Sequence, residues 1–170
     1  MQALGLIWRD VGPFAQDHEE VATPLDGPGH FGARLLFNHW LQKQEKGGMI
    51  VGRDIPARAL SSSLRNLALY EPIAGCRDFQ IRLAGNAFLR RFGRDVTGLK
   101  LSNLFEGAMF ERHRSQMAEM IANREPFSTD VVLKKSRRES LQFERLGLPI
   151  LNENGGRLAL IGIFYHDWVG

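Results

Sequence analysis

The sequence predicts an α+β domain, in which a five-stranded antiparallel sheet carries helices over one face and follows a helical extension. Three observations lead to this fold class. Short segments that alternate apolar and polar residues occur both early and late in the chain. A run with apolar residues at helical spacing lies between them. A turn rich in asparagine and glycine, Asn152–Gly156, separates the last two segments, so these neighbouring strands can pair through a short connection.

The first 30 residues are predicted to form an arm or loop. Positions 10–30 combine proline, glycine and acidic residues with little periodicity. Residues 1–30 hold one arginine against five acidic residues, although the whole chain carries a net charge of +3; the acidic residues are Asp10, Asp17, Glu19, Glu20 and Asp26. An acidic lead before a basic body can fold back over it, face a partner or aid solubility, and net charge alone does not choose among these.

A helical extension is predicted over residues 31–66. Leu36 and Trp40 lie four residues apart in an apolar stripe that ends before Gly47-Gly48. A second helix is predicted from Asp54 to about Asn66. The apolar stripe can pack on the domain's own sheet or on the same helix of a second subunit, and the pattern leaves both alternatives open.

The core is predicted over residues 67–170 and begins with two strands, Leu67–Ile73 and Phe79–Ala84, joined by a short connection. A short basic helical turn, Asn86–Phe92, follows the second strand. A longer amphipathic helix is predicted at Ala108–Asn123. Together these helices provide the cover for one face of the sheet.

Three further strands are predicted at Phe127–Lys135, Leu141–Leu151 and Leu158–Tyr165. The first alternates apolar and polar residues. The last is apolar on both faces, which is typical of a central strand that is covered on both sides.

The stretch from Asp78 to Phe105 resembles a PAS domain. Its segments Arg82-Leu83-Ala84-Gly85, Gly93-Arg94-Asp95-Val96-Thr97-Gly98 and Leu101-Ser102-Asn103-Leu104 are similar to the PAS_5 family, a stand-alone bacterial branch. The resemblance covers roughly residues 31–167. It implies a sensory or interaction module in which short helices wall off a cavity on one face of the sheet, and it implies no particular reaction.

Composition narrows the class of protein. A chain of 170 residues with 44% hydrophobic and 24% charged residues suits one globular domain. The single Cys76 excludes an intrachain disulfide and a cysteine metal cluster, and it suits a reducing compartment. No apolar run approaches the ~20 residues of a membrane span, and the amino terminus lacks a signal-peptide pattern. We therefore expect a cytoplasmic protein.

Arg82, Asn86 and Thr97 are candidate ligand-binding residues at the cavity rim. A guanidinium group binds carboxylate or phosphate in two-pronged fashion, and Arg82 alternates away from the apolar face of its strand. Its alternatives are a fixed bridge to Asp95 or Glu144, or exposure to solvent. Asn86 and Thr97 can equally be a helix cap and a turn residue.

His113 and Met117 are candidates on the long helix, where they share an apolar face. In haem-binding PAS sensors a histidine on the corresponding helix binds iron, so the resemblance implies haem as one alternative for His113. The other is a histidine bonded to backbone or solvent. Light-sensing PAS relatives carry a reactive cysteine on the helical cover, where this chain reads Asn86–Arg91 without one, so flavin adduct chemistry is excluded. The cofactor, if any, stays undetermined.

Two classes of function are not expected. The chain has no Gly-x-Ser-x-Gly, phosphate-loop or His-Glu-x-x-His motif, so we do not expect an enzyme. The basic segment Lys134–Arg138 has neither stacking aromatic residues nor a reading helix, so we expect no nucleic-acid partner. That segment is a solvated hairpin or a contact for an acidic partner.

The expected function is sensory or regulatory, through binding of a small ligand or a partner protein in signal transduction. A ligand-free interaction adaptor is the alternative, and it predicts a filled core with an exposed patch on the first helix or the outer sheet face. A haem-binding sensor and an enzyme are further alternatives. A signalling protein partner and a homodimer formed through the amino-terminal helix are also expected.

Overall fold

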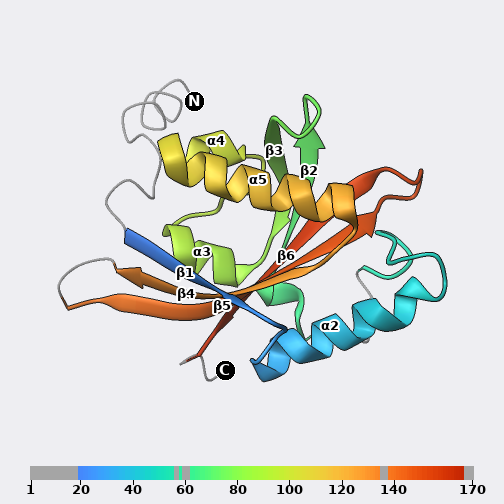
Figure 1. The fold of residues 1–170 in the computed structure, drawn as a ribbon, viewed down its shortest axis with the longest axis horizontal. Coiled ribbons are helices and arrows are strands. Elements are labelled where there is room, and N and C mark those ends of the chain that lie inside the picture. The colour runs from blue at the N-terminus through green and yellow to red at the C-terminus, as the bar shows by residue number, and fades with distance from the viewer. Residues whose placement is uncertain (1–18, 56–57, 59–61, 135–137, 167–170) are drawn as a thin grey trace.

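The computed structural model of the protein describes residues 19–55, 58, 62–134 and 138–166. An antiparallel sheet of six strands, in the order β1-β4-β5-β6-β2-β3, forms its centre (Figure 1). The strands are β1 (Glu19–Leu25), β2 (Leu67–Ile73), β3 (Asp78–Ala84), β4 (Phe127–Lys134), β5 (Ser140–Leu151) and β6 (Arg157–Tyr165). The helices are α2 (Phe31–Gln44), a single 3-10 turn η2 (Leu64–Asn66), α3 (Asn86–Phe92), α4 (Leu101–Leu104) and α5 (Gly107–Asn123).

The α+β fold and the five predicted strands are confirmed, each strand to within one residue at either end. β6 lies between β5 and β2. Every side chain from Leu158 to Tyr165 is buried, as the apolar character of both strand faces predicted. Ile161 and Ile163 enter one core, while Leu160 and Phe164 enter the other.

The sheet therefore separates two apolar cores. One lies between the sheet and the layer of α3, α4 and α5. The second lies under α2 on the opposite face, where Leu36 and Trp40 are buried. The Trp40 indole Nε1 donates a hydrogen bond of 2.9 Å to the carbonyl of Pro149 in β5. The apolar stripe of the amino-terminal helix thus packs on its own sheet, and helices cover both faces rather than one.

β1 corrects the prediction of an arm or loop. Residues 19–25 pair antiparallel with β4, with Val21 opposite Val132, and add a sixth strand at the sheet edge. Pro24 is compatible with this place because an edge strand needs to pair along one side only. The free edge of β4 offers backbone partners that no local pattern in this segment reveals. Residues 1–18 of the predicted arm lie outside the described residues.

The second helix predicted in the extension is largely untested, because residues 56–57 and 59–61 lie outside the described part. Its ends differ from the prediction. Asp54 lies in a turn, where its carboxylate accepts a hydrogen bond of 2.8 Å from the Ile50 amide. The final residues, Leu64–Asn66, form one 3-10 turn instead of an α-helix.

Gly85 sets the entry of α3 onto the sheet. A Cβ atom at this position would lie 2.4 Å from the carbonyl oxygen of Arg65, so only glycine allows the two backbones to approach this closely. The Gly85 amide donates a hydrogen bond of 2.9 Å to Leu67 at the start of β2. This close approach places the inner face of α3 over the sheet.

Candidate ligand-binding site

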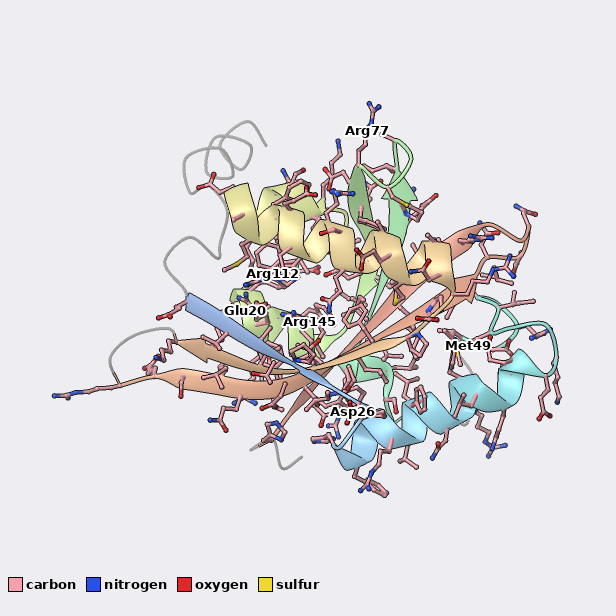
Figure 2. All side chains as sticks on the ribbon, in the orientation of Figure 1. Glu20, Asp26, Met49, Arg77, Arg112 and Arg145 are labelled. Carbon is pink, nitrogen blue, oxygen red and sulfur yellow. The ribbon has the colours of Figure 1, made fainter. Side chains whose placement is uncertain are left out.

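Four ionisable side chains from four different elements meet between the sheet and the helical layer. The Glu20 carboxylate of β1 lies 3.1 Å from Arg91 Nη2 of α3 and 2.9 Å from Arg145 Nη2 of β5. Its Oε1 also lies 3.1 Å from His113 Nε2 of α5. We call Glu20, Arg91, His113 and Arg145 the buried charge cluster. Figure 2 shows Glu20 and Arg145 close together beneath α5.

Local sequence explains how each member faces inward. Arg91 shares the buried face of α3 with Ala87 and Phe88, which precede it by four and three residues, and the adjacent Phe92 is buried as well. Its guanidinium carbon lies 4.6 Å from the centre of the Phe92 ring. His113 stacks on Phe105, with ring centres 4.1 Å apart. Arginine and histidine are thus held against aromatic faces that limit their movement.

Glu20 and Arg145 reach the same space from the sheet. In register, Glu20 lies opposite Leu133, and Thr129 of β4 lies opposite both Pro24 and Arg145. Directly opposite residues of antiparallel strands point to the same face. The inward face of β1 therefore brings the carboxylate to the face that carries Arg145.

The electrostatics favour an ionised carboxylate and a neutral imidazole. Burial alone would raise the pKa of Glu20, but Arg145, His113 and Arg91 outweigh it and hold that pKa far below its usual range. Burial, helped by Arg145, lowers the pKa of His113 to about 4. At neutral pH the buried charge cluster therefore contains two guanidinium charges against one carboxylate, an excess of one positive charge.

The cluster also has unused hydrogen-bonding capacity. Arg91 is almost fully buried, yet among the described residues its Nε and Nη1 have no hydrogen-bond partner. His113 Nε2 is near Glu20, but the contact is not aligned as a hydrogen bond. Thr129 Oγ1 is likewise buried without a partner in the described part of the chain. Buried donors are usually satisfied, so unpaired ones at a cavity indicate a place for a further acceptor.

A small cavity of about 30 Å³ is lined by three members of the cluster, Arg91, His113 and Arg145, while Glu20 and Thr129 are not among its lining residues. Such a volume holds one or two water molecules, at roughly 10–15 Å³ for each. Its polar lining consists of Tyr70, Arg91, His113, Gln116 and Arg145, and its apolar lining includes Phe88, Met117 and Ile161. With Glu20 in place, the cavity does not fit a haem, so His113 is not positioned as a haem ligand here.

Two of the five predicted site residues, His113 and Met117, line this cavity. The other three lie elsewhere. Asn86 is an exposed first residue of α3, and the N-cap position is Gly85, so Asn86 is not the cap either. Thr97 is an exposed turn residue whose amide donates a hydrogen bond of 3.0 Å to the Asp95 carboxylate.

Arg82 is half exposed and pairs with Glu71 on the neighbouring strand β2. Neither of the partners considered from the sequence, Asp95 and Glu144, binds it. The cause is a shift of register: Leu69 lies opposite Leu83 and Tyr70 opposite Ile81, which leaves Arg82 as the extra residue of a bulge. Ile81, the preceding residue, is buried in the core beneath the helical layer, while Arg82 is exposed.

Glu20, Arg91 and Arg145 were not predicted. A usable signal existed for Arg91, since it interrupts the apolar face of a seven-residue helix. Arg145 lies in a strand segment whose neighbours are buried on both faces, which is an unusual place for a charge. Glu20 had no such signal, because its segment showed no strand pattern.

An antiparallel sheet with short helices over one face and a cavity beneath them defines the PAS class of domain. The chain belongs to the PAS_5 family, described as a PAS domain, which it matches over residues 29–165. This confirms the resemblance that the Arg82–Gly98 segment indicated. The match begins after β1, so Arg91, His113 and Arg145 lie inside it and Glu20 lies outside it.

Other comparisons add little. Comparison with curated proteins gave no match. Among solved structures, an RNA-binding Light-Oxygen-Voltage receptor is similar, with a TM-score of 0.42 and 16% sequence identity. The alignment covers 86% of this chain and 38% of the receptor. Within the described residues, no helix is both long and apolar enough to cross a membrane.

Proposed function

We propose that this protein is a cytoplasmic regulatory PAS module that binds a small ligand between its sheet and the α3–α5 layer and passes the signal to a protein partner. The PAS family and fold support the sensory class. The ligand, the partner and the cellular location are parts of the proposal.

The observation that carries the proposal is the buried charge cluster at the cavity. Arg91 and Arg145 come from the helical layer and from the sheet, and both present donors to the same space. A ligand that bound both would connect the two layers. Because removal of charge from water is unfavourable without a partner, such a site selects an anionic ligand over a neutral one.

Signalling would follow from differential binding. A ligand changes the population of two arrangements only if it binds one more tightly than the other. Arg91 lies on a helix of seven residues, which is short enough to shift as a unit against the sheet. We therefore place the responsive element in α3 and the strand that pairs with its arginine, β1.

The test uses the full chain purified from its own host. Mass spectrometry under denaturing conditions would identify a copurified anion, and thermal unfolding would be followed while a library of small anions and neutral molecules is added. We expect an anion to raise the midpoint temperature of thermal unfolding of the wild type. The same rise is expected for Arg82→Gln, a control at an exposed arginine, but not for Arg145→Gln. A protein that carries no small molecule and whose midpoint no library member raises would contradict a ligand-binding function.

We propose a non-catalytic role for this site. His113 contacts Glu20 and Phe105, and the described residues that line the cavity include no serine, threonine or cysteine. Its low pKa makes it a weak base at neutral pH. Turnover of any library anion that depended on His113 would overturn this part of the proposal.

An interaction adaptor remains a second candidate because of the outer surface of α2. Phe31 is 68% exposed and Leu35 49% exposed, beside a groove of about 260 Å³ that His30 and Phe164 also line. This surface is also where a homodimer through the amino-terminal helix would form. Sedimentation and partner capture by Phe31→Ser, compared with wild type, test whether this surface mediates interaction. Loss of self-association or of partner capture in the variant would support the adaptor function. Unchanged sedimentation and capture would exclude this surface as the interface.

A further inference from the structure

We infer that Glu20 is a built-in, displaceable occupant of a carboxylate site, and that a small dicarboxylate binds Arg91, Arg145 and His113 in its place and thereby detaches β1 from the sheet edge. The inference rests on the proposed ligand-binding function. It adds the class of ligand and the element that responds.

The first argument is the size of the cavity. About 30 Å³ admits water but no organic anion while the Glu20 carboxylate occupies the cluster. The donors that face a ligand are the same ones that now bind Glu20, at 2.9 Å from Arg145 and 3.1 Å from Arg91. An incoming carboxylate can make these contacts only after Glu20 has left.

The second argument is the balance of charge and donors. Glu20 supplies one negative charge to two buried arginines. Among the described residues Arg91 Nε and Nη1 have no hydrogen-bond partner, and His113 Nε2 lies 3.1 Å from Glu20 Oε1 without an aligned hydrogen bond. A dianion with acceptor oxygens on two carboxylates would neutralise both guanidinium groups and use the remaining donors, which a single glutamate cannot do. The site is therefore better matched to a small dicarboxylate than to its present occupant.

The third argument concerns how β1 is held. Glu20 is the one fully buried side chain of β1; the others are exposed or partly exposed. Apart from its backbone ladder with β4, the strand is anchored chiefly through this carboxylate. Arg112 Nη2 of α5 is 3.5 Å from the Glu20 carbonyl oxygen, a weak additional contact at the same end (Figure 2). Exchange of Glu20 for a ligand would leave an edge strand with little side-chain anchoring.

Glu20 and the dicarboxylate compete for the same donors, and this competition determines how removal of Glu20 changes the affinity for the ligand. Glu20 is tethered close to the cluster, so its effective concentration is on the order of millimolar or higher. A free dicarboxylate must overcome this internal competitor. Removing the Glu20 side chain should therefore strengthen ligand binding, whereas removal of an ordinary structural ion-pair partner has no reason to do so.

The experiment uses malonate as the probe, on the full chain. Calorimetry would compare wild type with Glu20→Ala and with Glu19→Ala, a matched control at the exposed neighbouring position. We expect Glu20→Ala to bind malonate at least ~10-fold more tightly than wild type and Glu19→Ala to bind as wild type does. Malonamide, which has the same shape without the charge, should not bind any of the three.

A second measurement does not depend on how well the variants fold. Hydrogen exchange of wild type should show that the β1 amides of residues 20–23 and 25 lose protection as malonate saturates, while amides of β6 keep theirs. Malonate binding that leaves β1 protected would overturn the inference, as would equal malonate affinity in wild type and Glu20→Ala. Tighter binding of inorganic phosphate than of malonate by Glu20→Ala would overturn the dicarboxylate assignment.

Failure here is distinguishable from failure of the proposed function. If protein from the native host carries a neutral molecule in its cavity and does not bind malonate, the ligand-binding function is supported and the displacement of Glu20 is contradicted. If no molecule copurifies and no library member binds wild type or Glu20→Ala, the ligand-binding function and the displacement of Glu20 are both contradicted.

Discussion

Glu20 and Arg91 are 71 residues apart in the chain and form an ion pair whose side chains are 0% and 1% exposed. The pair joins the edge strand β1 to the helix α3, which otherwise belong to different parts of the fold. Arg145 completes the neutralisation from the sheet. An ion pair this deeply buried is sensitive to the loss of either partner, since the remaining charge cannot reach water.

The first prediction concerns Arg91→Met. We expect this variant to lower the free energy of unfolding by about 1.5–3 kcal/mol, because it removes one of the two guanidinium groups that bind the buried carboxylate while Arg145 still neutralises it. Equilibrium unfolding in urea measures the change. The matched control is Arg82→Met, where the exposed pair with Glu71 should contribute less than ~1 kcal/mol. Equal losses in the two variants would contradict the importance of burial.

The second prediction concerns pH. The pKa of His113 is about 4 in the folded protein, against an ordinary value of 6.5, because burial and Arg145 disfavour the imidazolium. Between these values the unfolded chain binds the proton more readily, so the free energy of unfolding should fall as pH is lowered from about 6.5 to 4. The contribution is up to about 3 kcal/mol, at about 1.4 kcal/mol per pKa unit.

Titration of Glu20 also lowers the free energy of unfolding as the pH falls. Its pKa is held below the ordinary 4.5, so its stabilisation is complete above that value and declines as pH falls below it. We expect His113→Gln to flatten the upper part of the pH profile and keep the lower part. His39→Gln, at a partly buried histidine with a smaller downward pKa shift, is the control. A profile in which His113→Gln retains the full decline above pH 4.5 would argue against this assignment.

The third prediction concerns Gly85→Ala. The added Cβ would meet the Arg65 carbonyl oxygen at 2.4 Å, and backbone atoms cannot easily move aside. We expect a loss of about 1–3 kcal/mol in the free energy of unfolding. Gly27→Ala is the control, because a Cβ there meets nothing within 4 Å and the backbone is not left-handed. A neutral Gly85→Ala would show that α3 can shift without cost.

The fourth prediction concerns Trp40→Phe. The change removes the 2.9 Å hydrogen bond to Pro149 and part of the buried ring. We expect a loss of about 1–3 kcal/mol from the orphaned carbonyl and the space left behind. Leu41→Ala, at an exposed position on the same helix, should change stability by less than ~0.5 kcal/mol. Thermal unfolding separates the two, and similar shifts would mean that α2 does not pack as described.

The elements that sequence predicted well are those whose burial follows a local period. Leu158–Tyr165 is apolar on both faces and is covered by both cores. Phe127–Lys134 alternates apolar and polar residues, and it lies next to the edge strand. The inner face of α5 likewise follows from the spacing of His113 and Met117. In each case the signal lies within one turn or one strand.

The parts that sequence missed depend on partners far along the chain. β1 forms because β4 has a free edge, and no periodicity within Glu19–Leu25 expresses this. The bulge at Arg82 depends on how β3 registers with β2. The cluster needs β1, α3, α5 and β5 to meet, so its existence follows from the topology and not from any one segment.

Two consecutive residues of β5 bind the two ends of the stretch from Glu20 in β1 to His30 at the start of α2. Arg145 binds Glu20 on the helical side, while Glu144 accepts hydrogen bonds of 2.9 and 2.8 Å from the Gly29 and His30 amides that lead into α2. Because neighbouring strand residues share a peptide bond, they cannot move independently. A displacement of β5 at this point is therefore transmitted to both layers of the molecule at once, which makes the stretch from 20 to 30 a short mechanical link between its two sides.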